Sequence, residues 1–418
     1  MRKLFLPLLF IAMSYNALLA QVTDPTITSW IQNTTATGYA GIVSNCQLVQ
    51  YATNNVYVSC TCIPGYSIGP WNNPNVASNQ NFVYKITRHP QPETGTQTAV
   101  GMGHIGVLIN GVSLFNVYDG YWWDTTTNNW NSTPSMTTHL WNRNALKYEY
   151  PSFDNCIGHP QQQGEYHHHV SPKCLYDQTD STHHSPLIGY AFDGYPIYGA
   201  YGYATANNAS SGIKRMKSSY VLQSASTRYL GPPVNSTYPL GNLCEDYVYT
   251  QGAGDLDASN GRLCVTPEYP NGTYAYFMTL DASLNPTFPY TFYGNYYGVV
   301  PTGNIGPNSG HQTVASTDTV QTYTPSTTGV EELKNQTLDF LVFPNPTNTM
   351  LHIFIQPIYS NDFTVELYDM MGRKIISKNN VHPTITESLD VSQVAAGNYV
   401  LKIFNSQFSS TKKITIGE

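Results

Sequence analysis

Residues 105–115 and 188–198 follow the same pattern of an apolar run, a turn pair and a second apolar run. The turn pairs are Asn110-Gly111 and Asp193-Gly194, which accept the positive φ angles of a tight hairpin. Both segments are therefore predicted to be β-hairpins, and their likeness suggests two related β-rich halves. Because no convincing amphipathic helix is visible, the predicted fold class is all-β.

The chain is poor in charge, which limits what it can bind. Only 11% of its 418 residues are charged, against about 25% in a typical soluble protein, and 33 residues are tyrosine. The net charge is -7, so we expect no nucleic-acid partner, because a phosphate-tracking surface needs clustered Lys and Arg. Tyrosine-rich, uncharged sequences of this kind favour β-sheets.

The N-terminus predicts the compartment. Arg2 and Lys3 precede an apolar run, residues 4–13, and the segment ends at residues 17–20 with the small residue Ala20. This pattern is typical of a secretory signal peptide, predicted at residues 1–20. The apolar run is too short to span a bilayer, and we expect no transmembrane segment elsewhere.

Seven cysteines follow the predicted signal peptide, and they should pair in an oxidising compartment. Two pairings are favoured because each joins cysteines close in sequence and closes one compact loop. They are Cys156 with Cys174 and Cys244 with Cys264. Cys60 and Cys62 share one face of a predicted strand. They could form a metal site, but one bridge to Cys46 and one free thiol is the favoured alternative.

The last part of the chain reads as a separate unit. Residues 312–329 are rich in Thr, Ser and Gln, and a linker is predicted at 326–338. Short alternating strands with turn residues between them then predict a small Ig-like β-sandwich at 339–418. This segment resembles the C-terminal sorting domain of the type IX secretion system, with matching residues at 344–346, 365–369, 372–373, 389–392 and 397–401. The resemblance implies the secretion machinery as a partner and a secreted or cell-surface location, with possible surface attachment after sorting.

Histidines are concentrated in one region of the chain. Six of the twelve lie between residues 159 and 184. If residues 166–170 form a strand, His167 and His169 share one face and His168 faces the other way. Two imidazoles so placed can reach one metal ion, and neutral imidazole suits zinc or copper. The candidate ligands are His159, His167, His169 and His184. The candidates for side chains that orient the ligand rings by hydrogen bonds are Asp154, Glu165, His168 and Asp193.

The same region resembles a known family. Residues 155–160, 164–169, 172–175, 184–199 and 254–274, with the hairpin at 110–112, look like the YHYH-motif proteins. The chain departs at one signature place, because His168 stands where the family has Tyr. The resemblance implies a β-rich extracellular unit at 21–325, with long loops stapled by disulfides. It implies no particular reaction.

Three functions are compatible with these sequence features. The first is a secreted transition-metal-binding domain. The second is a metal-dependent extracellular enzyme, a hydrolase or an oxidoreductase, for which Glu165 is the nearby candidate base. The third is an adhesion or glycan-binding module in which the histidines are hydrogen-bonded structural residues. Calcium is less favoured, because the Asp-rich segment 255–261 lacks the closing glutamate of a calcium loop.

Overall fold

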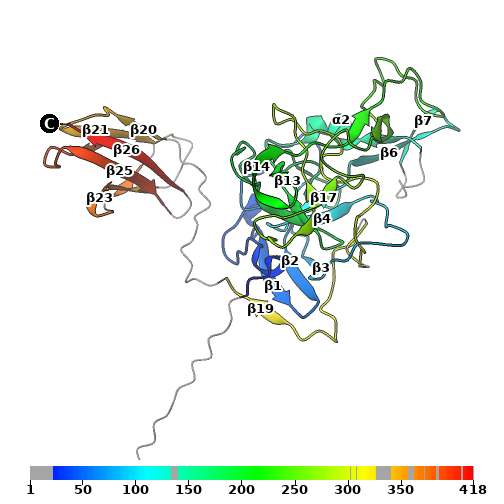
Figure 1. The fold of residues 1–418 in the computed structure, drawn as a ribbon, viewed down its shortest axis with the longest axis horizontal. Helices are drawn as coiled ribbons and strands as arrows, with labels where there is room; N and C mark the ends of the chain where they lie inside the picture. Colours follow the sequence, from blue (N-terminus) through cyan, green and yellow to red (C-terminus); the bar gives the residue numbers. More distant parts are fainter. Residues whose placement is uncertain are drawn as a thin grey trace, which may run out of the picture. The chain divides into compact units, whose positions relative to one another are not determined.

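Short strands make up most of the regular structure, which confirms the predicted all-β class (Figure 1). The computed structural model describes residues 22–132, 140–301, 303–306, 308–325, 340–355, 362–370, 372–382, 386–405 and 408–417. The predicted signal peptide and the predicted linker at 326–338 lie outside the described residues. The chain divides into two compact units, Met1–Pro325 and Ser326–Glu418.

The helices are single turns. They are α1 (Pro25–Thr28), α2 (Ala145–Tyr148) and the 3-10 turns η1 (Tyr39–Gly41), η2 (Tyr150–Ser152) and η3 (Cys244–Asp246). Within the described residues, no helix has the length and apolar character needed to cross a membrane.

An eight-stranded sheet forms the centre of the larger unit. Its strands, in spatial order, are β17 (Gly261–Cys264), β18 (Thr273–Phe277), β12 (Pro196–Tyr198), β11 (Leu187–Ala191), β4 (His104–Leu108), β5 (Ser113–Phe115), β10 (Tyr166–His168) and β9 (His159–Pro160). The two predicted hairpins are confirmed as β4–β5 and β11–β12, with positive φ at Gly111 and Gly194. The hairpins lie side by side, because β4 pairs with β11.

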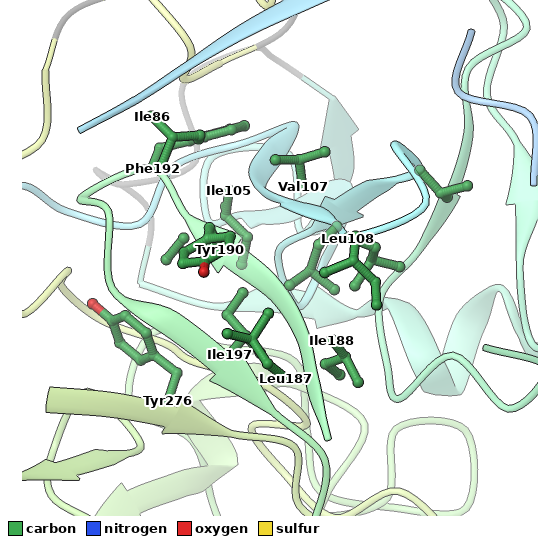
Figure 2. Close-up of a cluster of buried hydrophobic side chains, with 14 of the residues drawn as sticks. Ile86, Ile105, Val107, Leu108, Leu187, Ile188, Tyr190, Phe192, Ile197 and Tyr276 are labelled. Atoms are coloured by element: carbon green, nitrogen blue, oxygen red, sulfur yellow. The ribbon is translucent and has the colours of Figure 1, made fainter. Parts of the chain in front are cut away.

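Glycine at the junction of the two hairpins lets them approach closely. A Cβ atom added at Gly106 would lie 2.7 Å from the Tyr190 carbonyl oxygen, and one at Gly189 would lie 2.6 Å from that of Val107. The hairpins therefore pair without side chains between their backbones at these positions. Around them pack the buried aliphatic and aromatic side chains of the main core, including Val107, Ile188 and Phe192 (Figure 2).

Smaller sheets surround the central one. A four-stranded sheet contains β19 (Gln321–Tyr323), β1 (Cys46–Tyr51), β2 (Asn55–Cys60) and β3 (Phe82–Thr87). A three-stranded sheet contains β7 (Asn129–Ser132), β6 (Tyr118–Asp124) and β8 (Asn142–Asn144). Two hairpins complete the unit, β13 (Tyr201–Thr205) with β14 (Asn208–Arg215) and β15 (Tyr220–Leu222) with β16 (Tyr247–Tyr249).

The structure contains the predicted bridge between Cys156 and Cys174. The structure does not join Cys244 to Cys264 as predicted. Cys244 lies in η3 and packs in a core cluster with Val117, whereas Cys264 ends β17 in the main core. The two thiols therefore belong to different packing clusters, although they are close in sequence. Cys46, Cys60 and Cys62 are also free and buried.

The smaller unit consists of two sheets around one core. The first contains β20 (Phe340–Phe343), β21 (Met350–Ile355) and β24 (Glu387–Asp390). The second contains β23 (Lys374–Val381), β22 (Phe363–Asp369), β25 (Gly397–Phe404) and β26 (Ser409–Ile416). Inward residues of both sheets, such as Ile353 and Leu401, form one buried cluster. This is a two-layer β-sandwich, while its Ig-like strand arrangement stays a prediction.

Candidate metal centre

Three histidine rings converge at the edge of the central sheet. His159 belongs to β9, His167 belongs to β10, and His169 follows β10 directly. The register places His159 opposite His167. The Nε2 atom of His167 lies 3.1 Å from Nε2 of His159 and 3.1 Å from Nε2 of His169. The three side chains are buried, and their ligand atoms all lie within 4.8 Å of one another.

The opposite nitrogen of each ring bonds to the protein. The Nδ1 atom of His167 lies 3.1 Å from the Glu165 carbonyl oxygen, and that of His169 lies 2.5 Å from the Asn116 carbonyl oxygen. A carbonyl only accepts, so both Nδ1 atoms must carry the proton. The Nε2 atoms of His167 and His169 then point lone pairs into the cluster.

The third ring has the same tautomer by a different route. The Nδ1 atom of His159 lies 2.7 Å from the Ser152 hydroxyl, which lies 2.7 Å from the Glu149 carbonyl oxygen. The hydroxyl donates to that carbonyl and can therefore accept from Nδ1 of His159, while the Asn73 amide nitrogen lies 3.4 Å from the same Nδ1 atom. The shorter Ser152 contact favours the tautomer in which Nε2 of His159 also presents a lone pair to the cluster.

Burial keeps the rings of His159 and His167 neutral. Desolvation, followed by the neighbouring His169 and His168, lowers the pKa of His159 to about 3. The pKa of His167 is lowered well below its usual range, again mainly by burial and then by His159 and His169. Neutral imidazole is the protonation state that binds a metal ion.

Glu149 completes the group and is absent from the sequence-based candidates. Its Oε2 atom lies 3.1 Å from Nε2 of His169 and 3.7 Å from Nε2 of His159, and it makes no hydrogen bond. The residue lies at the end of α2, whose first turn is capped by the side chain of Asn144. Pro151 prevents the helix from continuing, so Glu149 is the residue that ends α2.

Two aromatic rings hold the histidines in place. Phe115 stacks on His167 with ring centroids 3.8 Å apart, and Phe153 meets His159 edge-on at 4.7 Å. These contacts restrict ring rotation and exclude water from one side of the cluster. Solvent comes closest at Glu149, whose side chain is 27% exposed, against 3% for His169.

His168 faces away from the cluster, as the alternation predicts. Its Nδ1 atom lies 2.8 Å from the Ile157 carbonyl oxygen, and its Nε2 atom lies 3.1 Å from the Tyr66 hydroxyl. The ring therefore fixes the loop before β9. The departure from the family motif at this position leaves the three-ring cluster intact.

The three carboxylates predicted to orient the ligands bond elsewhere. Asp154 accepts the Tyr166 hydroxyl at 2.9 Å and holds the turn at 156–158 through backbone N–H groups. The Glu165 carboxylate lies 3.0 Å from Nδ1 of His104. Asp193 accepts the Tyr276 hydroxyl at 2.6 Å and the Gly298 N–H at 2.9 Å. Backbone carbonyls and one serine orient the rings instead.

His184 is not brought to the cluster. It is buried against Tyr198 and Tyr203, and its Nδ1 atom lies 2.8 Å from the Ser185 carbonyl oxygen. Tyr198 belongs to β12, which β11, β4 and β5 separate from β10 in the central sheet. His184 therefore lies apart from the three converging rings.

His184 offers a test of histidine burial away from the cluster. Burial lowers the pKa of His184 to about 4, so the folded state lacks a proton that the unfolded chain binds below about pH 6.5. This contribution to stability is present above pH 6.5 and is lost as the pH falls towards 4. When the pH falls from 7 to 4, the free energy of unfolding should decrease in both proteins. The decrease should be about 3 kcal/mol smaller in a His184→Gln variant than in the wild type.

Urea unfolding at the two pH values measures this difference, because any constant cost of the substitution cancels. Equal losses in the two proteins would show that His184 is not held neutral by burial.

The fold and the site define a class of protein, an all-β chain with a buried three-histidine cluster and a separate C-terminal β-sandwich. Comparison with protein families identifies both parts. The YHYH protein family matches residues 83–291, which is half of the chain, and the protein belongs to this family. The secretion system C-terminal sorting domain matches residues 341–417 and indicates export by the type IX system to a secreted or cell-surface location. No curated protein matches the chain.

Proposed function

We propose that the larger unit binds one transition-metal ion through the Nε2 atoms of His159, His167 and His169. The observation that carries the proposal is the inward direction of three unprotonated nitrogens. The lone pair of His167 Nε2 lies 3.1 Å from the Nε2 atoms of both His159 and His169, and such lone pairs repel one another in a buried site. A cation bound by all three nitrogens would replace this repulsion with attraction.

The spacing of the nitrogens suits a small ion with nitrogen ligands. Two nitrogens on a tetrahedral zinc ion, each about 2.1 Å from the metal, are about 3.4 Å apart. The observed separations of 3.1 Å are close to this value. Imidazole favours zinc or copper, whereas calcium prefers oxygen ligands. We therefore propose zinc or copper.

Glu149 is the proposed fourth ligand. Its Oε2 atom is as close to the His169 nitrogen, at 3.1 Å, as the histidine nitrogens are to each other. A buried carboxylate oxygen without a hydrogen bond requires another source of stabilisation. A cation shared with the histidines provides it.

Elemental analysis of the purified full chain tests the proposal directly. We expect about one zinc or copper ion per chain, and X-ray absorption with three nitrogen ligands and one oxygen ligand. If the protein contains no metal, and neither ion raises its melting temperature, the histidines are structural and the adhesion or glycan-binding function gains support.

The exposure of Glu149 favours a second candidate, a metal-dependent extracellular enzyme. The Glu149 side chain is 27% exposed although its Oε2 atom is buried, so a substrate or water would approach the cluster along this side chain. Glu149, rather than the predicted Glu165, is the acidic side chain next to the histidine cluster. Activity that a chelator abolishes and the metal restores would establish this function.

A Glu149→Gln variant separates the fourth ligand from the other three. The amide is a weaker ligand and removes a negative charge, so we expect a decrease in metal affinity of about 10- to 100-fold. The fold should persist, because the Oε2 atom makes no hydrogen bond. Isothermal titration measures the affinity, and Glu93→Gln in a separate loop is the matched control. An unchanged affinity would place Glu149 outside the coordination sphere and leave the three-histidine site standing.

We also propose how the chain is processed for export. A signal peptide at residues 1–20 directs the first step, and the segment at 339–418, behind a linker at 326–338, engages the type IX machinery. The functional unit is then residues 21–325, released or attached at the cell surface. Terminal sequencing of the secreted protein tests both boundaries.

A further inference from the structure

Two buried thiols face each other in the four-stranded sheet, in a part of the unit that the metal proposal does not use. Cys46 begins β1 and Cys60 ends β2, and the antiparallel register pairs these two residues directly. Their relative exposures are 0% and 2%. Directly opposed residues in antiparallel strands project to the same side of the sheet.

The backbone at this pair suits a covalent link. The Cys46 N–H donates to the Ile31 carbonyl at 3.1 Å, and the Cys46 carbonyl accepts the Asn33 N–H at 2.8 Å. Both polar groups of Cys46 therefore point away from β2, as in a non-hydrogen-bonded pair, and a register shift between Cys46 and Leu48 separates this pair from the rest of the ladder. In such a pair the opposed Cα atoms are about 4.5 Å apart. Disulfides span Cα separations of about 4.4 to 6.8 Å.

The turn between β4 and β5 shows that the two sulfur atoms are neighbours. A Cβ atom added at Gly111 would lie 3.1 Å from Sγ of Cys60 and 3.2 Å from Sγ of Cys46. Both sulfurs therefore border the same small space. The Sγ atom of Cys62 lies 3.3 Å from the Ser113 hydroxyl and 3.1 Å from the Tyr166 carbonyl. The Sγ atom of Cys46 has one weaker contact of this kind, 3.6 Å to the Ile109 carbonyl.

We propose that Cys46 and Cys60 form a second disulfide in the exported protein, which ties β1 to β2 and leaves Cys62 as a thiol. The two thiols lose two protons and two electrons as the S–S bond forms. The disulfide of an exported thiol–disulfide oxidoreductase accepts them and becomes a dithiol. The sorting domain supports this setting, because export takes the chain out of the reducing cytoplasm.

The bridge must form early in folding. Burial raises the pKa of both thiols well above the usual range, so the reactive thiolate is scarce once the sheet is packed. An oxidant also cannot reach residues that are 0% and 2% exposed, so we infer that oxidation precedes the burial of β1 and β2. This inference is independent of the metal site.

Peptide mapping of the secreted full chain, alkylated without reduction, tests the proposal. Cleavage after Tyr51 and Tyr57 separates Cys46 from the other two cysteines. We expect a peptide pair linked through Cys46 that disappears on reduction and in a Cys60→Ser variant, and persists in Cys62→Ser. The Cys156–Cys174 bridge is the internal control for exposure to oxidant.

Two outcomes would overturn the proposal. One is an alkylated Cys46 in wild-type protein whose Cys156–Cys174 bridge is intact. The other is a linked peptide that survives in Cys60→Ser and disappears in Cys62→Ser, which would assign the bridge to Cys62. Neither outcome depends on bound metal, so the result does not bear on the proposed metal site.

Discussion

A His167→Ala/His169→Ala variant is expected to lose its bound metal while both units stay folded. The change removes two of the three nitrogens that converge at the edge of the central sheet. Loss of one outer hydrogen bond to a ligand costs about 10- to 100-fold in affinity, so loss of two ligands should cost more. At metal concentrations of about 1,000 times the dissociation constant, the wild type gains about 4 kcal/mol that the variant lacks.

Elemental analysis and thermal unfolding, with and without added zinc or copper, measure both effects. His168→Gln is the matched control, because His168 lies on the same strand, is fully buried and faces away from the cluster. The control should keep its metal and its thermal response to metal. One ion per chain retained by the double variant would refute this ligand set.

Strand alternation carried the strongest part of the prediction. Side chains two residues apart share a face, so the pairing of His167 with His169 and the separation of His168 follow from the sequence alone. The hairpins at Asn110-Gly111 and Asp193-Gly194 were predictable for a similar reason, since their turn residues report a local backbone conformation. Local rules therefore predicted the hairpins and the shared face of His167 and His169, while His159 was named as a further candidate ligand without a rule that fixes its position.

The residues around the rings lie beyond such rules. The Nδ1 acceptors of His167 and His169 are backbone carbonyls, which every residue has, so the sequence holds no signal for them. Glu165 precedes β10, which begins at Tyr166, so alternation does not fix its direction. Its carboxylate turns to His104 instead.

Sheet order explains the residues that the prediction misplaced. His184 follows the triple-histidine strand closely in sequence, but it packs beside β12 rather than beside β9 and β10. Glu149 is the opposite case, because a short helix end returns it to the rings. The positions of His184 and Glu149 both depend on tertiary contacts, and no local sequence pattern predicts such contacts.

The Cys156–Cys174 bridge should support the metal centre as well as the fold. All three histidines lie between the bridged cysteines, which are 18 residues apart in sequence. A Cys156→Ser/Cys174→Ser variant should lose about 3 kcal/mol of unfolding free energy, as expected for a closed loop of this length. It should also bind metal about tenfold or more weakly, because binding must then order a segment that the bridge no longer restrains.

Chemical denaturation and isothermal titration of the metal measure the two losses. Cys264→Ser is the matched control, since Cys264 is a buried thiol of the same unit without a bridge. Coupling between two equilibria is reciprocal, so saturating metal should make the wild-type bridge harder to reduce by the same factor by which the bridge tightens metal binding. Equal metal affinity in the bridged and unbridged proteins would mean that β9 and β10 hold the rings unaided, and that the bridge contributes to stability alone.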